Sequence, residues 1–354
     1  MEEALAPQVS RFCGMRSLVT QPAPEPTAAA PAAPARHLLL RASSWLRLGG
    51  LTLVAALLWF TLRGLEWQKL GAALQHTNPL PVLLAAGVNF LHHACKAVYW
   101  RTLLLPVRRL SIGRLFRYSV AQSVGSVLAP ARAGEALRVW MLKKHWNLPV
   151  PVTGAVAALE KVGDLNALLL LLLPLPWLWP ARPWWVDRAL LALFAGALAV
   201  TVALYLARRS EALRARPLFA GLQLLRSPGA ILLAMTGLVG AWLADLAVVW
   251  LVIWALGVPA PVHAGIVILL TVNLAIAIPA APANAGTLEL GAITAFELLG
   301  LGRDTGLAFG LVYHSAQVIP ILLVGLLDGQ RLLREPAWEE REGHAASPPA
   351  GDRS

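Results

Sequence analysis

The stretch that decides the fold runs from Ser126 to Trp140 and reads SVLAPARAGEALRVW. It stands between apolar runs, yet it holds a proline, a glycine and the charged residues Arg132, Glu135 and Arg138. Proline removes a backbone donor and breaks a helix, and charge is costly in an apolar environment. Such a segment indicates a deliberate break in a helix.

The break has a near copy later in the chain. APARAG at 129–134 recurs as APANAG at 281–286, and because 281 minus 129 is 152, the copies are offset by 152 residues. At the same offset, a Thr-Gly pair at 153–154 recurs at 305–306. The sequence therefore predicts an internal repeat with one break in each copy.

The composition predicts the class of protein. The 354 residues are 57% hydrophobic and 14% charged, with a mean hydropathy of +0.62, whereas soluble domains carry about 25% charged residues. The net charge of +11 does not indicate a nucleic-acid partner, because the Arg and Lys residues gather at the ends of apolar runs, where membrane topology requires them. We expect an all-α polytopic membrane protein that binds no nucleic acid.

The lengths of the apolar runs predict the spans. A helix needs about 20 apolar residues to cross about 30 Å of hydrocarbon. Two apolar regions, 116–142 and 262–300, are interrupted by prolines and are predicted to be re-entrant helical hairpins. Six unbroken runs are predicted to be full transmembrane helices: 45–65, 81–105, 150–173, 187–207, 229–256 and 305–327.

The basic residues predict the orientation. If the 116–142 region crossed the membrane, Lys143 and Lys144 would face outward, away from the other basic loops. The positive-inside rule holds only if this region enters and leaves on the cytoplasmic face. The 262–300 region then enters from the opposite face. We therefore expect both termini to be cytoplasmic and the chain to lie in the cytoplasmic (inner) membrane.

The two repeat units, about 79–173 and 229–327, then have opposite orientations. Each consists of a span, a hairpin and a span, which predicts an inverted-topology repeat, an architecture typical of secondary transporters. The predicted transmembrane domain covers 41–333. The Ala/Pro-rich segment 1–40 and the segment 334–354 are predicted to be disordered cytoplasmic tails.

Several charged residues are expected near the middle of the membrane. Arg132 and Glu135 follow the first break, and Glu160, Lys161 and Asp164 follow on the next predicted span. Each unpaired charge at the bilayer centre costs about 2.5–3.5 kcal/mol, so these groups must pair or contact water. Two compatible interpretations remain, a salt-bridge clasp that pins the hairpin and a headgroup or ion site at its tip. Arg138 is expected nearer the cytoplasmic surface.

Other polar residues are weaker candidates. Lys96 is expected to pair with the acidic residues, and Asp245 and Glu289 are expected to make interior polar contacts. The tip glycines Gly134 and Gly286 are expected to permit close packing. No metal site is expected, because no cysteine or carboxylate completes a ligand set with the neighbouring histidines of the 81–105 run.

These motifs together resemble the lysylphosphatidylglycerol synthase transmembrane-region family, also called flippase-like proteins. The resemblance rests on RAGEALR at 132–138, EKVGD at 160–164, PANAGTLE at 282–289 and YHSAQVIP at 313–320, and it covers about 46–333. The chain departs from the family at Ala283 and Asn284, where glycines are usual, and at Lys161, where arginine is common. The tail after residue 328 is too short for the family's soluble aminoacyl-transferase domain.

The resemblance and the repeat imply a flippase-like transporter that moves an amphipathic lipid or a lipid-linked intermediate between leaflets. Its substrate could be a glycolipid, an isoprenoid-type lipid or an aminoacylated phospholipid. A lipid-modifying enzyme similar to a glycosyltransferase and a scaffold for a lipid synthase are the alternatives, and lipid-biosynthesis enzymes are candidate partners. We expect no enzymatic activity and no cofactor.

In this interpretation Arg132, Arg138 and Lys161 attract an anionic headgroup, and acidic residues balance charge or couple protons. The full set of substrate or gating candidates is Lys96, Arg132, Gly134, Glu135, Arg138, Glu160, Lys161, Asp164, Asp245, Pro282, Asn284, Gly286, Glu289, Tyr313 and His314.

Overall fold

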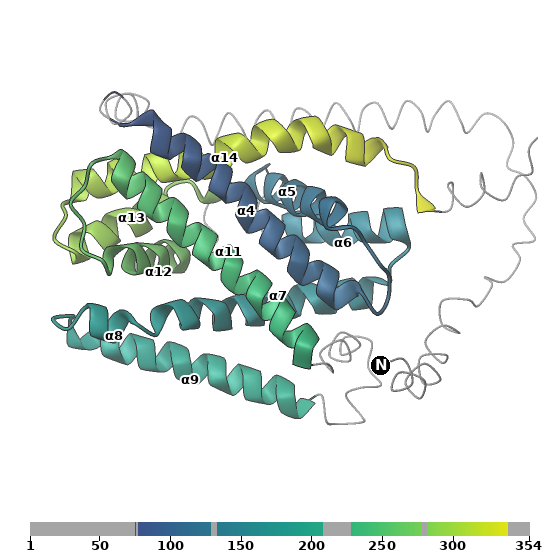
Figure 1. The fold of residues 1–354 in the computed structure, drawn as a ribbon, viewed down its shortest axis with the longest axis horizontal. Coiled ribbons are helices and arrows are strands. Elements are labelled where there is room, and N and C mark those ends of the chain that lie inside the picture. The colour runs from purple at the N-terminus through teal and green to yellow at the C-terminus, as the bar shows by residue number, and fades with distance from the viewer. Residues whose placement is uncertain (1–74, 76, 129–132, 208–227, 278–281, 339–354) are drawn as a thin grey trace, which may run out of the picture. The chain divides into compact units, whose positions relative to one another are not determined.

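The computed structural model describes residues 75, 77–128, 133–207, 228–277 and 282–338 (Figure 1). All of them belong to the compact unit Leu53–Ser354, whereas the unit Met1–Thr52 lies outside the described residues. The described residues contain helices and no strand, which confirms the all-α class for this part of the chain. The predicted first span at 45–65 and the tail 1–40 lie outside it.

The predicted runs within the described residues each form one long helix, and the two interrupted regions form shorter helices. The long helices are α4 (Pro79–Leu104), α7 (Val150–Leu172), α9 (Trp184–Ala207), α11 (Pro228–Ala255) and α14 (Arg303–Arg334). The shorter elements are α5 (Ile112–Leu128), α6 (Ala133–Trp146), α8 (Leu175–Leu178), α12 (Ala264–Ile276), η3 (Pro282–Asn284) and α13 (Thr287–Leu298).

Three helices of the described part are long and apolar enough to cross a membrane: Trp184–Ala207, Pro228–Ala255 and Arg303–Leu332. Helices α4 and α7 have 26 and 23 residues, which is also sufficient length for about 30 Å of hydrocarbon. They are less apolar because they carry charged side chains such as Lys96 and Glu160. These two side chains pair with each other and so connect α4 to α7.

Each interrupted region forms two short helices that pack against one another. A Cβ atom added to Gly134 in α6 would lie 1.9 Å from the carbonyl oxygen of Gln122 in α5. A Cβ atom on Gly291 in α13 would lie 2.8 Å from the Cα atom of Val272 in α12. Helices α12 and α13 have 13 and 12 residues, so at about 1.5 Å per residue neither reaches across a bilayer.

Close packing was expected at both tip glycines, but Gly286 at the second tip is not closely packed. Nothing lies within 4 Å of the position where Gly286 would carry a Cβ atom. Its backbone instead has φ +84°, and Ala283 and Asn284 before it have φ 56° and 58°. Glycine adopts such left-handed geometry freely and Asn does so with little strain, whereas Ala is strained there. Gly286 is therefore required for the turn and Gly134 for packing.

Helices α4 and α11 lie side by side and antiparallel (Figure 1). The N–H of Asn78 at the start of α4 donates to the carbonyl of Ala255 at the end of α11, at 2.9 Å. Farther along, a Cβ atom on Gly237 would lie 2.9 Å from the carbonyl oxygen of Cys95. Small residues thus allow the two backbones to approach closely.

Two apolar cores of the described residues include residues of this pair of helices. The α4–α7 core includes Tyr118, Met141 and Val156 together with Leu238 of α11. The α12–α14 core includes Ile268, Ala292 and Phe309 together with Ala85 of α4 and Leu171 of α7. Each core therefore combines residues from the earlier and the later part of the chain.

The end of α14 is fastened to the start of α5. The Arg117 guanidinium pairs with Asp328 at 2.7 Å and with Glu335 at 3.3 Å, and Arg114 also pairs with Glu335. The guanidinium of Arg108 lies 3.9 Å from the ring centre of Trp338. These contacts hold α14 in place as far as Arg334, past the predicted end of the run at 327. The predicted tail 334–354 therefore begins with residues that contact other helices, such as Glu335 and Trp338.

Candidate functional site

A buried ion cluster joins the first hairpin to α4 and α7. Its centre is Glu160, whose carboxylate lies 3.0 Å from the ammonium of Lys96 and 3.1 Å from the guanidinium of Arg138, and accepts a hydrogen bond from the Trp100 indole at 2.5 Å. Lys96 also pairs with Asp164. Arg138 and Glu160 are only 3% and 4% exposed.

The cluster contains two cations and two anions, so its formal charge is balanced. Arg138 uses a second nitrogen to donate to the hydroxyl of Ser119 in α5 at 3.1 Å. Buried charges are tolerated only when they are paired and hydrogen-bonded, and this arrangement satisfies that condition. The contacts tie α4, α5, α6 and α7 together at one point.

The structure brings the predicted clasp residues together in a different combination from the expected one. Lys161 pairs with Glu135 at 2.9 Å, outside the buried cluster, with side chains that are 43% and 30% exposed. Arg138 was expected near the cytoplasmic surface, but it takes the buried position beside Glu160, because it lies about one turn after Glu135 on α6. Arg132 lies outside the described residues, and so does the predicted break at 129–132.

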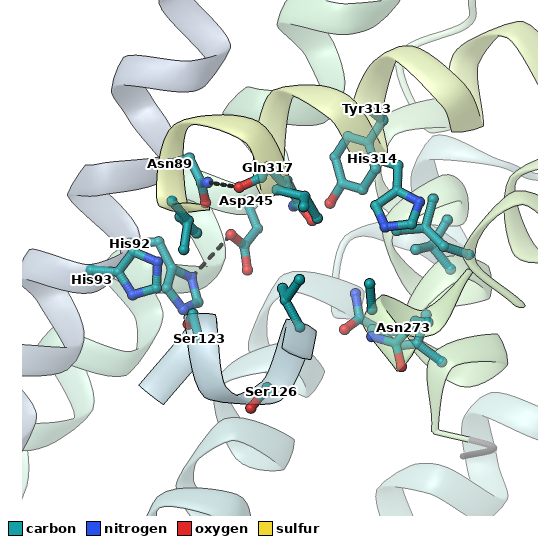
Figure 2. Close-up of a pocket in the computed structure, with 18 residues that line it drawn as sticks. Asn89, His92, His93, Ser123, Ser126, Asp245, Asn273, Tyr313, His314 and Gln317 are labelled. Atoms are coloured by element: carbon teal, nitrogen blue, oxygen red, sulfur yellow. Dashed lines mark hydrogen bonds and ion pairs between the residues drawn. The ribbon is translucent and has the colours of Figure 1, made fainter. Parts of the chain in front are cut away.

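A polar cavity of about 240 Å³ lies where the two hairpins meet (Figure 2). It is lined by α4, α5, α11, α12, η3, α13 and α14, and hence by helices from both interrupted regions. Its polar lining residues are Asn89, His92, His93, Ser123, Ser126, Asp245, Asn273, Asn284, Tyr313, His314 and Gln317.

Two histidine–carboxylate pairs stand at the cavity. The Nδ1 atom of His92 in α4 lies 3.0 Å from Asp245 Oδ1 in α11. The Nδ1 atom of His314 in α14 lies 2.7 Å from Glu289 Oε1 in α13, and Glu289 Oε2 accepts the backbone N–H of Gly286 at 2.7 Å. Figure 2 shows His92 and His314 on different sides of the cavity. The second pair also fixes the turn at the second hairpin tip.

Both interrupted regions make a similar contact with the long helix that follows them. Glu135 of α6 pairs with Lys161 of α7, and Glu289 of α13 pairs with His314 of α14. In both cases an acidic residue on the second short helix pairs with a basic residue on the next long helix. The pairs are similar but do not match exactly at the offset of 152 residues, and the second uses an imidazole in place of an ammonium.

Neutral side chains complete the cavity. Asn89 donates from its Nδ2 atom to the carbonyl of Gln317 at 3.0 Å, and Asn273 donates to the carbonyl of Leu269 at 2.8 Å. His93 is 4% exposed, and its Nδ1 atom contacts the hydroxyl of Ser119 at 3.1 Å. The Nε2 atom of His93 is buried and has no hydrogen-bond partner among the described residues.

The sequence interpretation did not include Asn273, Ser123 or Ser126 among the candidates. The available signal for Asn273 was its amide, which stands in the otherwise apolar α12 segment AGIVILLTVNLAI. The two serines lie on α5 near the first break and carried no signal of their own, because serine is common in such segments. Among the predicted candidates, Pro282 stands at the start of η3, at the second tip.

A second, larger hollow of about 880 Å³ lies between α7, α9 and α11. Its lining is almost entirely apolar, with Leu169, Phe194 and Leu238 among its residues. Its few polar residues include Asn166 and Thr201, and the Asn166 amide donates to the Thr201 hydroxyl at 3.0 Å. This hollow contains none of the predicted site residues.

Comparison with protein families gives one match, described as "Lysylphosphatidylglycerol synthase TM region", over residues 47–325. No curated protein and no solved structure matches the chain. The matched region contains both hairpins, the ion cluster and the polar cavity, and it confirms the family that the sequence motifs indicated. The chain belongs to the lysylphosphatidylglycerol synthase transmembrane-region family.

Proposed function

We propose that the protein is a transporter of the cytoplasmic membrane that moves an amphipathic lipid or lipid-linked intermediate between the two leaflets. The observation that carries the proposal is the polar cavity of about 240 Å³ at the meeting point of the hairpins. Irregular backbone at membrane depth is stable only when protein buries it or when it lines a wet cavity. Transporters place their substrate sites at such points, between two repeats.

The architecture proposed with this function has six full spans, two re-entrant hairpins and an inverted-topology repeat. The antiparallel contact of α4 and α11 supports it, because equivalent helices of inverted repeats run in opposite directions. The paired short helices of each interrupted region support it as well. Both termini are cytoplasmic in this arrangement, and the hairpins enter from opposite faces.

Cysteine labelling tests this topology. Single cysteines in place of the exposed residues Lys143, in the last turn of α6, and Arg303, at the start of α14, should react with membrane-impermeant reagents from opposite faces. The background should have Cys13 and Cys95 replaced by serine. Lys143 should be reached from the cytoplasm only. Labelling of both positions from one face would contradict the hairpins and the inverted repeat together.

Lipid exchange in liposomes tests the function. The purified full chain should speed the exchange of a labelled lipid between leaflets without ATP, because no phosphate-binding Walker motif occurs in the sequence. Glu289→Gln keeps the size of the side chain but removes the charge that holds His314 and the tip. Because charge-assisted hydrogen bonds contribute about 1.5–3 kcal/mol, the exchange rate should fall roughly 10-fold or more.

Glu297→Gln is the matched control, because Glu297 lies on the same helix but is exposed and does not line the cavity. Its exchange rate should equal that of the unmodified protein. Equal rates for both variants would contradict a role for the cavity. A reconstituted protein that moves no lipid but transfers a sugar or acyl group to one would replace transport with the lipid-modifying enzyme.

A further inference from the structure

The charges around the cavity are unusual for a site that binds phosphate. Among the described residues that line it, none is Lys or Arg, and the only carboxylate is that of Asp245. Glu289 is the partner of the lining residue His314 and does not itself line the cavity. Lys96 and Arg138 are held in the buried ion cluster, and Lys161 is paired with Glu135. An anionic group in the cavity would therefore meet one carboxylate and no permanent cation of the described lining.

Neither Asp245 of the lining nor the nearby Glu289 is well placed to bind a cationic headgroup. Both oxygens of Glu289 are engaged, one by His314 and the other by the N–H of Gly286. Asp245 already pairs with His92. A cation would have to compete with these partners in each case, and it would find no carboxylate that is wholly free for it.

The neutral groups have the opposite character, because they both donate and accept. Amide and hydroxyl side chains offer a donor and an acceptor within one group, which is also the property of a ligand hydroxyl. Asn89 and Asn273 each commit one amide N–H to a backbone carbonyl and keep an amide oxygen to accept. The amides and hydroxyls that line the cavity include Asn89, Asn273, Asn284, Gln317, Ser123 and Ser126.

An independent observation points to a bound polar group. His93 lines this cavity, and its Nε2 atom is buried and lacks a hydrogen-bond partner among the described residues. Buried polar atoms are nearly always satisfied by protein, water or ligand. A ligand hydroxyl can serve Nε2 in either tautomer, because it can donate to the ring or accept from it.

The size of the cavity selects a headgroup and not a whole lipid. Its volume is about 240 Å³, below the roughly 300–1,000 Å³ of sites for drug-sized ligands. We propose that the cavity takes an uncharged, hydroxyl-rich headgroup, a sugar or small polyol, with the phosphate and hydrocarbon parts of a lipid outside it. The proposal rests on the proposed function, in which the headgroup passes through this cavity.

A three-lipid exchange assay tests the proposal on the full chain in liposomes. The probes are fluorescent lipids with identical acyl chains and different headgroups: a monoglycosyl diacylglycerol, phosphatidic acid and a trimethylammonium lipid. The glycosyl lipid should exchange at least 10-fold faster than either charged lipid. If a charged lipid exchanges as fast or faster, the headgroup proposal is overturned while transport stands. If no lipid is moved, transport itself fails.

A pair of variants links the preference to the cavity. Asn273→Leu removes an amide from the lining, and it should reduce the preference for the glycosyl lipid from 10-fold or more to nearly none. Asn166→Leu removes the same amide from α7, outside the cavity, and it should keep the preference. Thermal unfolding of both proteins shows whether each is folded. A folded Asn273→Leu protein with an unchanged preference would overturn the proposal.

Discussion

Replacement of Arg138 by methionine is expected to lower the free energy of unfolding by about 3–5 kcal/mol. Arg138 is 3% exposed, and its guanidinium lies 3.1 Å from the Glu160 carboxylate. Without Arg138, the buried Glu160 keeps its ion pair with Lys96, but Lys96 also pairs with Asp164. The cluster then carries an excess negative charge in a low-dielectric environment. Unfolding of the purified protein in mixed detergent and dodecyl sulfate measures the change.

The double variant Arg138→Met with Glu160→Gln separates lost pairing from lost packing. It leaves Lys96 paired with Asp164, so the charge is balanced again and much of the stability should return. Lys161→Met is the matched control on α7, because its pair with Glu135 is exposed and such pairs contribute about 0–1 kcal/mol. A double variant no more stable than Arg138→Met would contradict the assigned pairing.

Substitution of Gly134 by alanine should have the second large effect. The added Cβ atom would lie 1.9 Å from the Gln122 carbonyl oxygen and 2.3 Å from the Ser126 hydroxyl oxygen. Alanine favours a helix over glycine by about 1 kcal/mol, but the overlap with backbone requires α5 and α6 to separate. Overpacking costs typically about 1–3 kcal/mol and sometimes more, and the shift also disturbs Arg138. We expect a lower yield of folded protein and lower stability.

Gly154→Ala is the control for this substitution. Gly154 is a helical residue of α7 with nothing within 4 Å of the added atom, so the variant should be as stable as the unmodified protein or gain up to about 1 kcal/mol. Gel filtration and thermal unfolding of both purified variants provide the comparison. A Gly134→Ala protein as stable as Gly154→Ala would show that the hairpin helices are not in close contact.

The helices could be predicted from the sequence, but the choice of ion partners could not. Apolar length alone predicted α4, α7, α9 and α11 to within three residues at each end. Glu160 and Lys161 are neighbours in sequence, but successive helical residues point about 100° apart. One therefore lies in the buried cluster and the other in a partly exposed pair. Which face is buried depends on tertiary packing.

The cavity could be predicted only in part, for a similar reason. Glu289 and His314 were identified because they carry strong chemistry, and the repeat directed attention to the second tip. Ser123 and Asn273 are ordinary residues on helices about 150 positions apart in the chain. They line one cavity only because the two hairpins pack against each other. The sequence predicts the hairpins, but no pattern in it predicts the contact between them.

The sharing of core residues between the earlier and the later helices has a consequence for biosynthesis. The α4–α7 core includes Leu238 of α11, which packs against Gly163 and lies 66 residues after the end of α7 at Leu172. At a synthesis rate of about 5–20 residues per second, that interval lasts roughly 3–13 s. Throughout this interval, the newly inserted first half of the protein contains its buried charges but lacks the core residues that α11 contributes. The insertion machinery must shelter this half until α11 arrives.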